Sequence, residues 1–421
     1  MVSMLLVGST SATWPRSRDG AMKYDFDRVY ERGNTDCIKW DLVRRQSCRQ
    51  DVISMGIADM DFPIAEPIHQ ALKRRVEHPF YGYTVPGPDV TEAVIDHAQR
   101  RLGWKVDPEW VVFFPGVVPA MNVAIKSLTH PGDQIVLQQP VYHPFFPAIT
   151  NNGCGIVNNQ LRLVDGQYEM DFDDLESKFS SAGGFHALPN RVKAVVLCNP
   201  HNPIGRVWSR DDLTRLGETA LKHGAVVISD EIHCEIVYKG FRHVSFATIS
   251  EDFEQNSIVC LAPSKTYNLA GLQTSTIIIP NKRLRDNFIC AGAEIPHPNL
   301  FGYLAMKVAY RECDEWLEQV LDYLQGNRDF LVDYVEHKLP AIRVLPPQGT
   351  YMAWLDFRGL GMDDQTLDRF TKERLGLELG LGSMFGECGS GFLRMNFACP
   401  RSMLMEALSR MEEAANSSAA M

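Results

Sequence analysis

Short runs of apolar residues, rich in Val and Ile, recur through the first two thirds of the chain. The clearest are WVVFF (110–114), QIVLQ (134–138), VKAVVLC (192–198), GAVVISD (224–230), SIVCLA (257–262) and STIIIP (275–280). They lack the polar alternation of a half-exposed strand, which is typical of strands covered on both faces of a parallel sheet. The pattern therefore predicts a buried, mainly parallel sheet.

Helical patterns lie between these runs. PAMNVAIKSL follows the first run, and SRDDLTRLGETALKHG separates the third from the fourth. In the second stretch Ser209 and Asp212 have the spacing of a capping box, and Gly224 follows the last helical position, so both ends of a helix are marked. Strands that alternate with helices in this way indicate an α/β domain.

The final third has a different pattern, with helical stretches over about 299–338, strand patterns in GTYMAWLDF and GFLRMNFA, and a last helix in SMLMEALSRMEEAA. This order predicts a smaller α+β domain, to which the N-terminal region contributes. We expect four segments, which are a disordered leader (1–21), an N-terminal arm that is part of the small domain (22–55), a large domain (56–295) and a small C-terminal domain (296–415).

Composition and charge exclude several kinds of function. The formal net charge of −10 argues against a partner that is nucleic acid or an anionic membrane. No apolar run approaches the roughly 18 residues that span a bilayer. The ten cysteines are scattered, form no CxxC pair and show no metal-site spacing. Free thiols of this kind predict a cytoplasmic protein without a bound metal.

Chemically distinctive residues follow five of the predicted strands. They are Gly116 in PGVVPA, Tyr142 in QPVYHPF, Asn202 in NPHNPIG, Asp230 in SDEIH and Lys265 in PSK. Ligands of open α/β sheets bind beyond the carboxyl ends of the strands, so these residues are expected to meet in one site. A lysine directly after a buried strand is notable, because most lysines are solvated at the surface.

The motifs NPHNPIG, SDEIH and SKTYNLAG, in this order, resemble the class I/II aminotransferase family of pyridoxal-phosphate (PLP) enzymes of fold type I, over nearly all of residues 22–415. The segments KYDFDRVYERGNTDCIKWD, GIADMDFP, YGYT, GVVPA and SDEIHCEIVY resemble more narrowly its MalY/PatB branch of cystathionine β-lyase-like enzymes. The resemblance implies a large PLP-binding domain, whose mainly parallel seven-stranded sheet is like that of aspartate aminotransferase, and a smaller C-terminal α+β domain.

The resemblance also implies roles for residues at the strand ends. Lys265 would bind PLP covalently and move the Cα proton of the substrate. Asp230 would pair with the protonated pyridinium nitrogen, because a buried carboxylate needs a cationic partner. Asn202 and His233 would lie beside the phenolic oxygen, and Tyr142 would stack on the ring. The alternatives are a turn cap for Asp230, an ordinary loop histidine for His233 and a core aromatic for Tyr142.

The phosphate of PLP would be bound mainly by backbone and hydroxyl groups. By resemblance the predicted ligands are Gly116, Val117, Val118, Ser264 and, from the partner subunit of a homodimer, Tyr83. Helix N-termini bind anions through their free N–H groups, and PAMNVAIKSL supplies such a helix. Two departures make this set less typical, since Ala262 stands where many relatives have Ser or Thr, and Gln273 where many have a basic residue.

Substrate recognition would rest on Arg394 in FLRMNFA. A guanidinium matches the substrate α-carboxylate with two parallel hydrogen bonds, although an arginine in a strand can also be an edge or surface residue. Asp59 and Asp61, in IADMDFP, would line the substrate side, with a turn or capping role equally open. Tyr83 is expected to reach the substrate across the dimer interface as well.

The expected activity is that of a PLP-dependent C–S β-lyase, which cleaves L-cystathionine or related S-substituted cysteines to a thiol, pyruvate and ammonia. An aminotransferase, in general or specialised biosynthetic metabolism, needs the same residues and stays an alternative. A racemase, cyclase or β/γ-replacement enzyme would share the same core, since fold alone does not select chemistry. A purely regulatory protein is disfavoured, because Lys265, Asp230 and Arg394 are all present.

Overall fold

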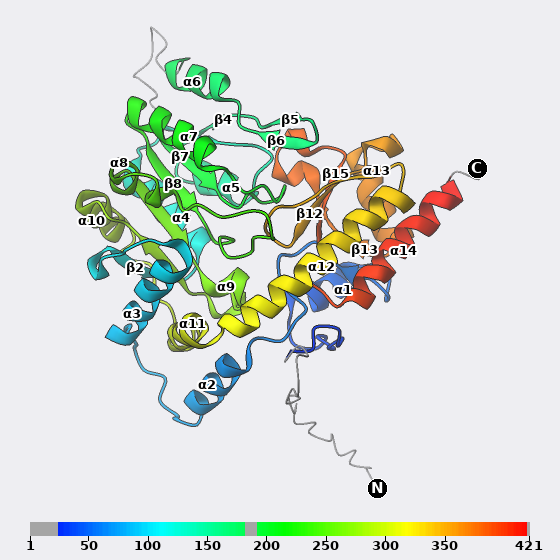
Figure 1. The fold of residues 1–421 in the computed structure, drawn as a ribbon, viewed down its shortest axis with the longest axis horizontal. Helices are drawn as coiled ribbons and strands as arrows, with labels where there is room; N and C mark the ends of the chain where they lie inside the picture. Colours follow the sequence, from blue (N-terminus) through cyan, green and yellow to red (C-terminus); the bar gives the residue numbers. More distant parts are fainter. Residues whose placement is uncertain (1–23, 182–191, 419–421) are drawn as a thin grey trace.

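The computed structural model describes residues 24–181 and 192–418, so the predicted leader lies outside the described residues. Its largest element is a seven-stranded sheet in the order β2-β10-β9-β8-β7-β3-β4 (Figure 1). The strands are β2 (Val111–Phe114), β3 (Gln134–Leu137), β4 (Gly155–Asn158), β7 (Val192–Cys198), β8 (Val226–Asp230), β9 (Ser257–Leu261) and β10 (Ser275–Ile278). All six predicted runs are strands of this sheet, and β10 runs antiparallel to both of its neighbours. The predicted mainly parallel sheet is confirmed.

Helices cover both faces of this sheet. One face packs against α4 (Val117–Leu128) together with α5 (Phe145–Thr150) and α10 (Lys282–Ala291), and the other against α6 (Phe172–Ser181) and α7 (Arg210–His223). Successive residues of one strand therefore enter different cores: Val196 packs in the α4 core and Val195 in the α7 core. Burial on both faces explains why the strands lack polar alternation.

Helix α7 has the ends that its sequence predicts. The Ser209 hydroxyl accepts a hydrogen bond from the Asp212 backbone N–H, and the Asp212 carboxylate accepts one from the Ser209 N–H. Gly224 ends the helix at φ +65°, a left-handed conformation that glycine adopts without a Cβ clash. Strand β4, by contrast, was not predicted, because it lies at the sheet edge and GIVN is only partly buried.

The C-terminal third forms a second, four-stranded antiparallel sheet in the order β11-β12-β15-β14. Its strands are β11 (Arg343–Leu345), β12 (Met352–Asp356), β14 (Gly380–Leu381) and β15 (Phe392–Asn396). The helices of this region are α11 (Leu300–Glu312), α12 (Asp314–Lys338), α13 (Asp364–Arg369) and α14 (Arg401–Ser418). The predicted helical stretch is thus two helices that meet at Cys313.

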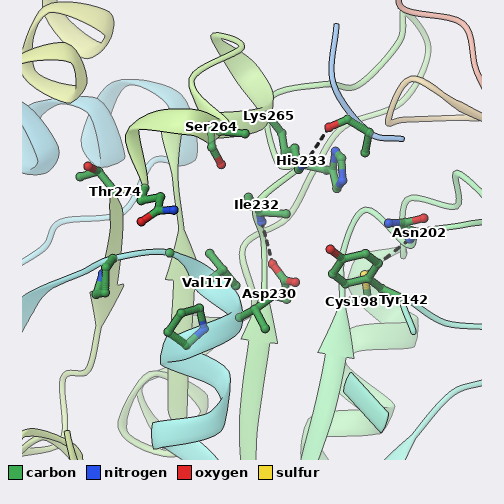
Figure 2. Close-up of a pocket in the computed structure, with 17 residues that line it drawn as sticks. Val117, Tyr142, Cys198, Asn202, Asp230, Ile232, His233, Ser264, Lys265 and Thr274 are labelled. Carbon is green, nitrogen blue, oxygen red and sulfur yellow. Dashed lines mark hydrogen bonds between the residues drawn. The ribbon is translucent and has the colours of Figure 1, made fainter. Parts of the chain in front are cut away.

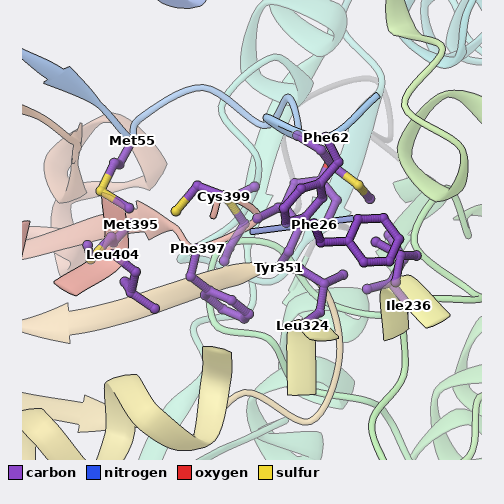
Figure 3. Packing of buried hydrophobic residues seen from close by; sticks show 14 of the residues in the cluster. Phe26, Met55, Phe62, Ile236, Leu324, Tyr351, Met395, Phe397, Cys399 and Leu404 are labelled. Carbon is purple, nitrogen blue, oxygen red and sulfur yellow. The ribbon is translucent and has the colours of Figure 1, made fainter. Parts of the chain in front are cut away.

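The N-terminal region joins the C-terminal third through strand pairing and aromatic packing. Strand β1 (Ile53–Ser54) pairs in parallel with β13 (Leu377–Glu378). Phe26 lies 5.1 Å from Phe62 and 6.1 Å from Trp316, measured between ring centroids, within the large core cluster drawn in Figure 3. The predicted contribution of the N-terminal arm to the small domain agrees with these contacts, while the exact domain boundaries stay a prediction.

The remaining α-helices and strands are short or lie at the periphery of the two sheets. They are α1 (Val43–Gln46), α2 (Glu66–Val76), α3 (Pro88–His97), α8 (Glu251–Gln255), α9 (Pro263–Thr266), and the hairpin of β5 (Arg162–Val164) and β6 (Gln167–Glu169). Within the described residues, no helix combines the length and apolar character that crossing a membrane requires.

Candidate active site

A cavity of about 340 Å³ opens at the carboxyl edge of the large sheet (Figure 2). The predicted residues that line it are Gly116, Val117, Val118, Tyr142, Asn202, Asp230, His233, Ser264 and Lys265. They come from the segments after β2, β3, β7, β8 and β9, so the strand ends meet as the sequence predicts. The other lining residues include Ala58, Cys198, Ile232, Gln273 and Thr274. Of these, the sequence had connected only Gln273 with the cofactor site.

Lys265 lies in the single turn of α9, four residues after β9 ends at Leu261. Its Nζ donates a hydrogen bond of 2.7 Å to the Ala58 carbonyl, which Figure 2 draws as a dashed line. Burial, reinforced by the charge of Arg394, lowers the pKa of Lys265 to about 8. The neutral amine, which is the nucleophilic form, is therefore accessible near physiological pH.

Asp230 is the last residue of β8 and is only 4% exposed. One carboxylate oxygen accepts a hydrogen bond from the Ile232 backbone N–H at 3.1 Å. Burial raises the pKa of Asp230 to about 7, and no Lys, Arg or His among the described residues forms an ion pair with it. A buried carboxyl group without a cation is suited to a cationic ligand atom.

His233 and Asn202 lie at the same edge, near Lys265 and Arg394 respectively. Burial, with the charges of Lys265 and Arg394, lowers the pKa of His233 to about 3, so its ring is neutral. Its Nδ1 has no hydrogen-bond partner among the described residues. The Asn202 Oδ1 accepts from Arg394 at 3.0 Å. Both side chains can thus serve a polar ligand in the cavity.

The cofactor-free Asp230→Asn protein is expected to be more stable than the wild type at pH 8, by about 2–4 kcal/mol. The pKa of Asp230 in the folded state, about 7, lies above its ordinary 3.8, so the folded protein holds a proton that the unfolded chain releases. Wild-type stability is therefore lost as pH rises from about 4 to about 7, and the amide variant escapes this loss. Urea unfolding at pH 5, 6, 7 and 8 measures the difference.

The matched control for this prediction is Asp211→Asn, at an exposed carboxylate in the first turn of α7. It should change stability by less than about 0.5 kcal/mol at each pH. An Asp230→Asn difference that does not grow between pH 5 and pH 8 would contradict the raised pKa. Saturating PLP should reduce the difference, because a pyridinium nitrogen gives the carboxylate its cation.

Arg394 projects from β15 of the small sheet and is 5% exposed. Its guanidinium donates to the Asn202 Oδ1 at 3.0 Å and to the Gly56 carbonyl at 2.6 Å, and lies 4.8 Å from the centroid of the Phe385 ring. Its Nε has no partner, and no carboxylate of the described residues pairs with it. Burial lowers the pKa of Arg394 to about 10. A buried guanidinium without a counter-ion is suited to an anionic ligand.

The opposite end of the cavity is formed by the start of α4. Gly116 precedes the helix at φ +122°, a conformation that favours glycine, and the first N–H groups of a helix have no partner within it. Ser264, Gln273 and Thr274 also line the cavity. Sequence reasoning missed Thr274, although a hydroxyl residue directly before the last run was a signal that it could have used. This end is suited to a phosphate.

The donor set as a whole fits PLP. The α4 N-terminus and the nearby hydroxyl groups suit its phosphate, Asp230 its pyridinium nitrogen, and Asn202 its phenolic oxygen. The Tyr142 ring lines the cavity beside Asp230, and the Lys265 amine can react with the aldehyde. Ala262, by contrast, is buried in the α4 core and does not line the cavity, so it leaves no gap in the phosphate end.

Besides Arg394, three predicted residues do not line the cavity of this chain, namely Tyr83, Asp59 and Asp61. Tyr83 is fully exposed on a segment without regular structure, and its role stays a prediction for a second subunit. The Asp59 carboxylate pairs with Arg32 at 2.9 Å, so its proposed contact with substrate also stays a prediction. Asp61 is buried and its carboxylate forms an ion pair with Lys39 at 2.6 Å, so in this structure the carboxylate stabilises the fold.

Comparison with known proteins agrees with the site. The sequence model of the aminotransferase class I and II family matches residues 50–411. Cystathionine beta-lyase PatB of Bacillus subtilis is 40% identical over 392 residues, which cover 93% of this chain and 99% of PatB. A PLP-bound putative aminotransferase from Clostridium difficile has a TM-score of 0.89 and 39% identity, and the match covers 93% of this chain and 100% of that one.

Cystalysin from Treponema denticola, whose crystal structure contains pyridoxal 5'-phosphate, has a TM-score of 0.88 and 34% identity, with 94% of this chain and 99% of cystalysin covered. The similarity thus extends over both sheets and the cavity between their elements. The chain belongs to the aminotransferase class I and II family, within the branch that contains PatB and MalY.

Proposed function

We propose that this protein is a PLP-dependent C–S β-lyase, which converts L-cystathionine or a related S-substituted cysteine to a thiol, pyruvate and ammonia. The observation that carries the proposal is the meeting of Lys265 and Asp230 in one cavity, at whose border Arg394 bonds to the lining residue Asn202 and has no carboxylate partner among the described residues. The 40% identity to cystathionine beta-lyase PatB over almost the whole of both chains supports it.

Each residue has a task that follows from its position. Arg394 binds the α-carboxylate of the amino acid and so orients its Cα–H bond. PLP, when bound, acts as an electron sink that makes the Cα proton acidic. Lys265, as a neutral amine, accepts this proton, and the electron pair left at Cα expels a thiolate from Cβ. Asp230 would pair with the pyridinium nitrogen of PLP and so favour its protonated, positively charged form. The released enamine then hydrolyses to pyruvate and ammonia.

The charges of the cavity disfavour an aminotransferase for aspartate or glutamate, whose side chains carry a net negative charge, whereas the side chain of L-cystathionine carries an ammonium group beside its carboxylate and is neutral overall. Among its described lining residues Lys265 is the only Lys or Arg, and Arg394 lies beside Asn202 at its border. The nearby Arg32 is already paired with Asp59 and Asp61. The described part of this chain therefore offers no second free cation at the cavity for a side chain with a net negative charge. An aminotransferase for neutral amino acids, including one in a specialised pathway, remains the second candidate.

A homodimer and a cytoplasmic location complete the proposal. The segment 78–87 has no helix or strand and exposes Phe80, Tyr81, Tyr83 and Val85, which is an unusual density of apolar side chains in water. A second copy of the chain would cover these side chains and receive Tyr83 at its cavity. All ten cysteines are unpaired, which agrees with a reducing compartment.

An assay without an acceptor tests the lyase. Purified protein loaded with PLP is incubated with L-cystathionine and, separately, with S-methyl-L-cysteine, and pyruvate and free thiol are measured with no 2-oxo acid present. We expect equal amounts of the two products over many turnovers. L-Alanine is the matched control, because it lacks a leaving group at Cβ and should yield no sustained pyruvate.

The same incubations with 2-oxoglutarate distinguish the second candidate. The lyase should be indifferent to this acceptor. Turnover that requires 2-oxoglutarate, with glutamate as a product and no thiol released, would overturn the lyase in favour of transamination.

A further inference from the structure

The segment 56–62 reaches the cavity at Ala58 and is held through its carbonyl groups. Charged or amide side chains donate to these oxygens: Arg394 to Gly56 (2.6 Å), Asn396 to Ile57 (2.7 Å), Lys265 to Ala58 (2.7 Å), Lys39 to Asp59 (2.7 Å) and Arg32 to Met60 (3.0 Å). The segment has no helix and only isolated backbone bonds, so these side chains set its path.

Two of these donors are the groups that the reaction uses. The Ala58 carbonyl accepts from Lys265 and, at 3.3 Å, from the Tyr351 hydroxyl, while the Gly56 carbonyl accepts from Arg394. Gly56 itself packs closely against the chain that follows β13, because a Cβ at this position would come within 3.0 Å of the Leu379 backbone. A displacement of segment 56–62 would therefore change the hydrogen bonding of the lysine and of the arginine together.

An ion-pair cluster from the N-terminal arm holds the other end of the segment. The Asp61 carboxylate accepts from Lys39 Nζ at 2.6 Å, from Arg32 Nη1 at 2.8 Å and from the Trp40 indole N–H at 2.8 Å. Lys39 is 1% exposed, so this charge is buried with its partner. Among the residues that the structure describes, only Arg32 reaches the carboxylates of both Asp59 and Asp61, because its Nη2 also donates to Asp59 at 2.9 Å.

The arm is itself anchored in the core, so it can act as a fixed support. Phe26 packs on Phe62, the last residue of the segment, and both lie in the cluster of Figure 3. Buried aromatic side chains remove a large apolar area from water, so the Phe26–Phe62 contact holds the arm more firmly than a contact between exposed side chains would. None of the family motifs assigns a task to Arg32, Lys39 or Trp40, and the lyase mechanism does not use them.

We propose that Arg32, together with Lys39 and Asp61, is a positioning residue, which holds segment 56–62 so that its carbonyl groups place Lys265 and Arg394. The planar guanidinium is needed because it bridges two carboxylates and a carbonyl at once, and an ammonium group cannot do so in the same geometry. The kinetic consequence rests on the proposed function, whereas the effect on segment 56–62 does not.

The test compares Arg32→Lys with Arg28→Lys in the full chain without cofactor. Arg28 is an exposed arginine of the same arm, whose side chain lies over Tyr30, and it is the matched control. Hydrogen exchange followed by mass spectrometry is expected to show the amides of 56–62 exchanging about tenfold faster in Arg32→Lys, with the strands of the large sheet unchanged. Arg28→Lys should exchange like the wild type.

A second readout follows Lys265 directly. In Arg32→Lys the Lys265 amine should lose its hydrogen bond to the Ala58 carbonyl, which stabilises the protonated form. A larger share of the amine is then neutral and nucleophilic. Acetylation of Lys265 by an N-hydroxysuccinimide ester at pH 7 should therefore be about threefold faster or more in this variant. Trp40→Phe, which removes one donor to Asp61 and keeps an aromatic ring, should shift both readouts in the same direction and by less. It also keeps the proposal testable if Arg32→Lys does not fold.

Wild-type exchange and acetylation in both folded variants would overturn the proposal. In the PLP-loaded protein, Arg32→Lys should lower kcat for L-cystathionine because Lys265 is displaced, and raise KM because Arg394 is displaced. If the cofactor-free readouts change but no lyase activity exists in the wild type, the proposed function fails and the positioning role stands.

Discussion

Lys265→Ala is expected to lower pyruvate formation from L-cystathionine by about 10⁴-fold or more, because one side chain supplies both the nucleophile and the proton acceptor. Lys265 is the only lysine or arginine among the described residues lining the cavity, so no neighbour can replace it there. Protein stability should hardly fall, since the substitution removes a charge whose burial already lowers its pKa to about 8. Pyruvate release and the visible absorbance of covalently bound PLP are the two measurements.

Lys282→Ala is the matched control, at an exposed lysine whose ammonium group pairs with Asp286. It should retain wild-type turnover. A small primary amine such as methylamine should restore part of the lost rate in Lys265→Ala and none in the control. If Lys265→Ala kept the absorbance of the covalent cofactor or more than about 1% of the turnover, the assignment of Lys265 would be wrong.

Arg394→Lys is expected to lower kcat/KM for L-cystathionine by about 10²–10³-fold, which corresponds to the loss of about 3–4 kcal/mol of charge-assisted hydrogen bonding. The lysine keeps a positive charge but cannot offer two parallel donors to a carboxylate. It also cannot bond Asn202 and Gly56 with the geometry that the guanidinium has. Steady-state kinetics over a range of substrate concentrations measure the change.

A substrate analogue separates binding of the carboxylate from general damage. In this analogue, hydrogen replaces the α-carboxylate of the cysteine part of L-cystathionine, which is the part that reacts. The analogue should react slowly with the wild type and about equally slowly with Arg394→Lys. Arg358→Lys serves as the control, because that arginine pairs with Asp356 at the protein surface. An equal loss for the substrate and its analogue would contradict a carboxylate clamp at Arg394.

Several features of the site followed from local sequence alone. A run such as VKAVVLC predicts a strand buried on both faces, and the residue after each such strand lies at the carboxyl edge of the sheet. These local patterns therefore predict that Asn202, Asp230 and Lys265 lie together, and all three line one cavity in the structure. The Ser209–Asp212 capping box was equally local and is confirmed.

Other features were not visible in the sequence because they depend on contacts between distant segments. Arg394 is 192 positions from Asn202, yet the two side chains are hydrogen-bonded. Ala58 has no functional group in its side chain, and only the fold brings its backbone carbonyl to Lys265, 207 positions away. Thr274 reaches the cavity through the turn before β10, whose antiparallel direction the apolar run did not reveal.

The sequence by itself determined the strand pattern, the helix caps, the resemblance to a PLP family and the residues at the strand ends, because each is encoded over a few neighbouring positions or in a short motif. The tertiary structure alone decided which groups Lys265 and Arg394 contact, the pairing of Arg32 with Asp59 and Asp61, and the exposure of Tyr83. The physical reason is that burial and hydrogen bonding at a site are set by packing between segments far apart in the chain, which no local pattern records.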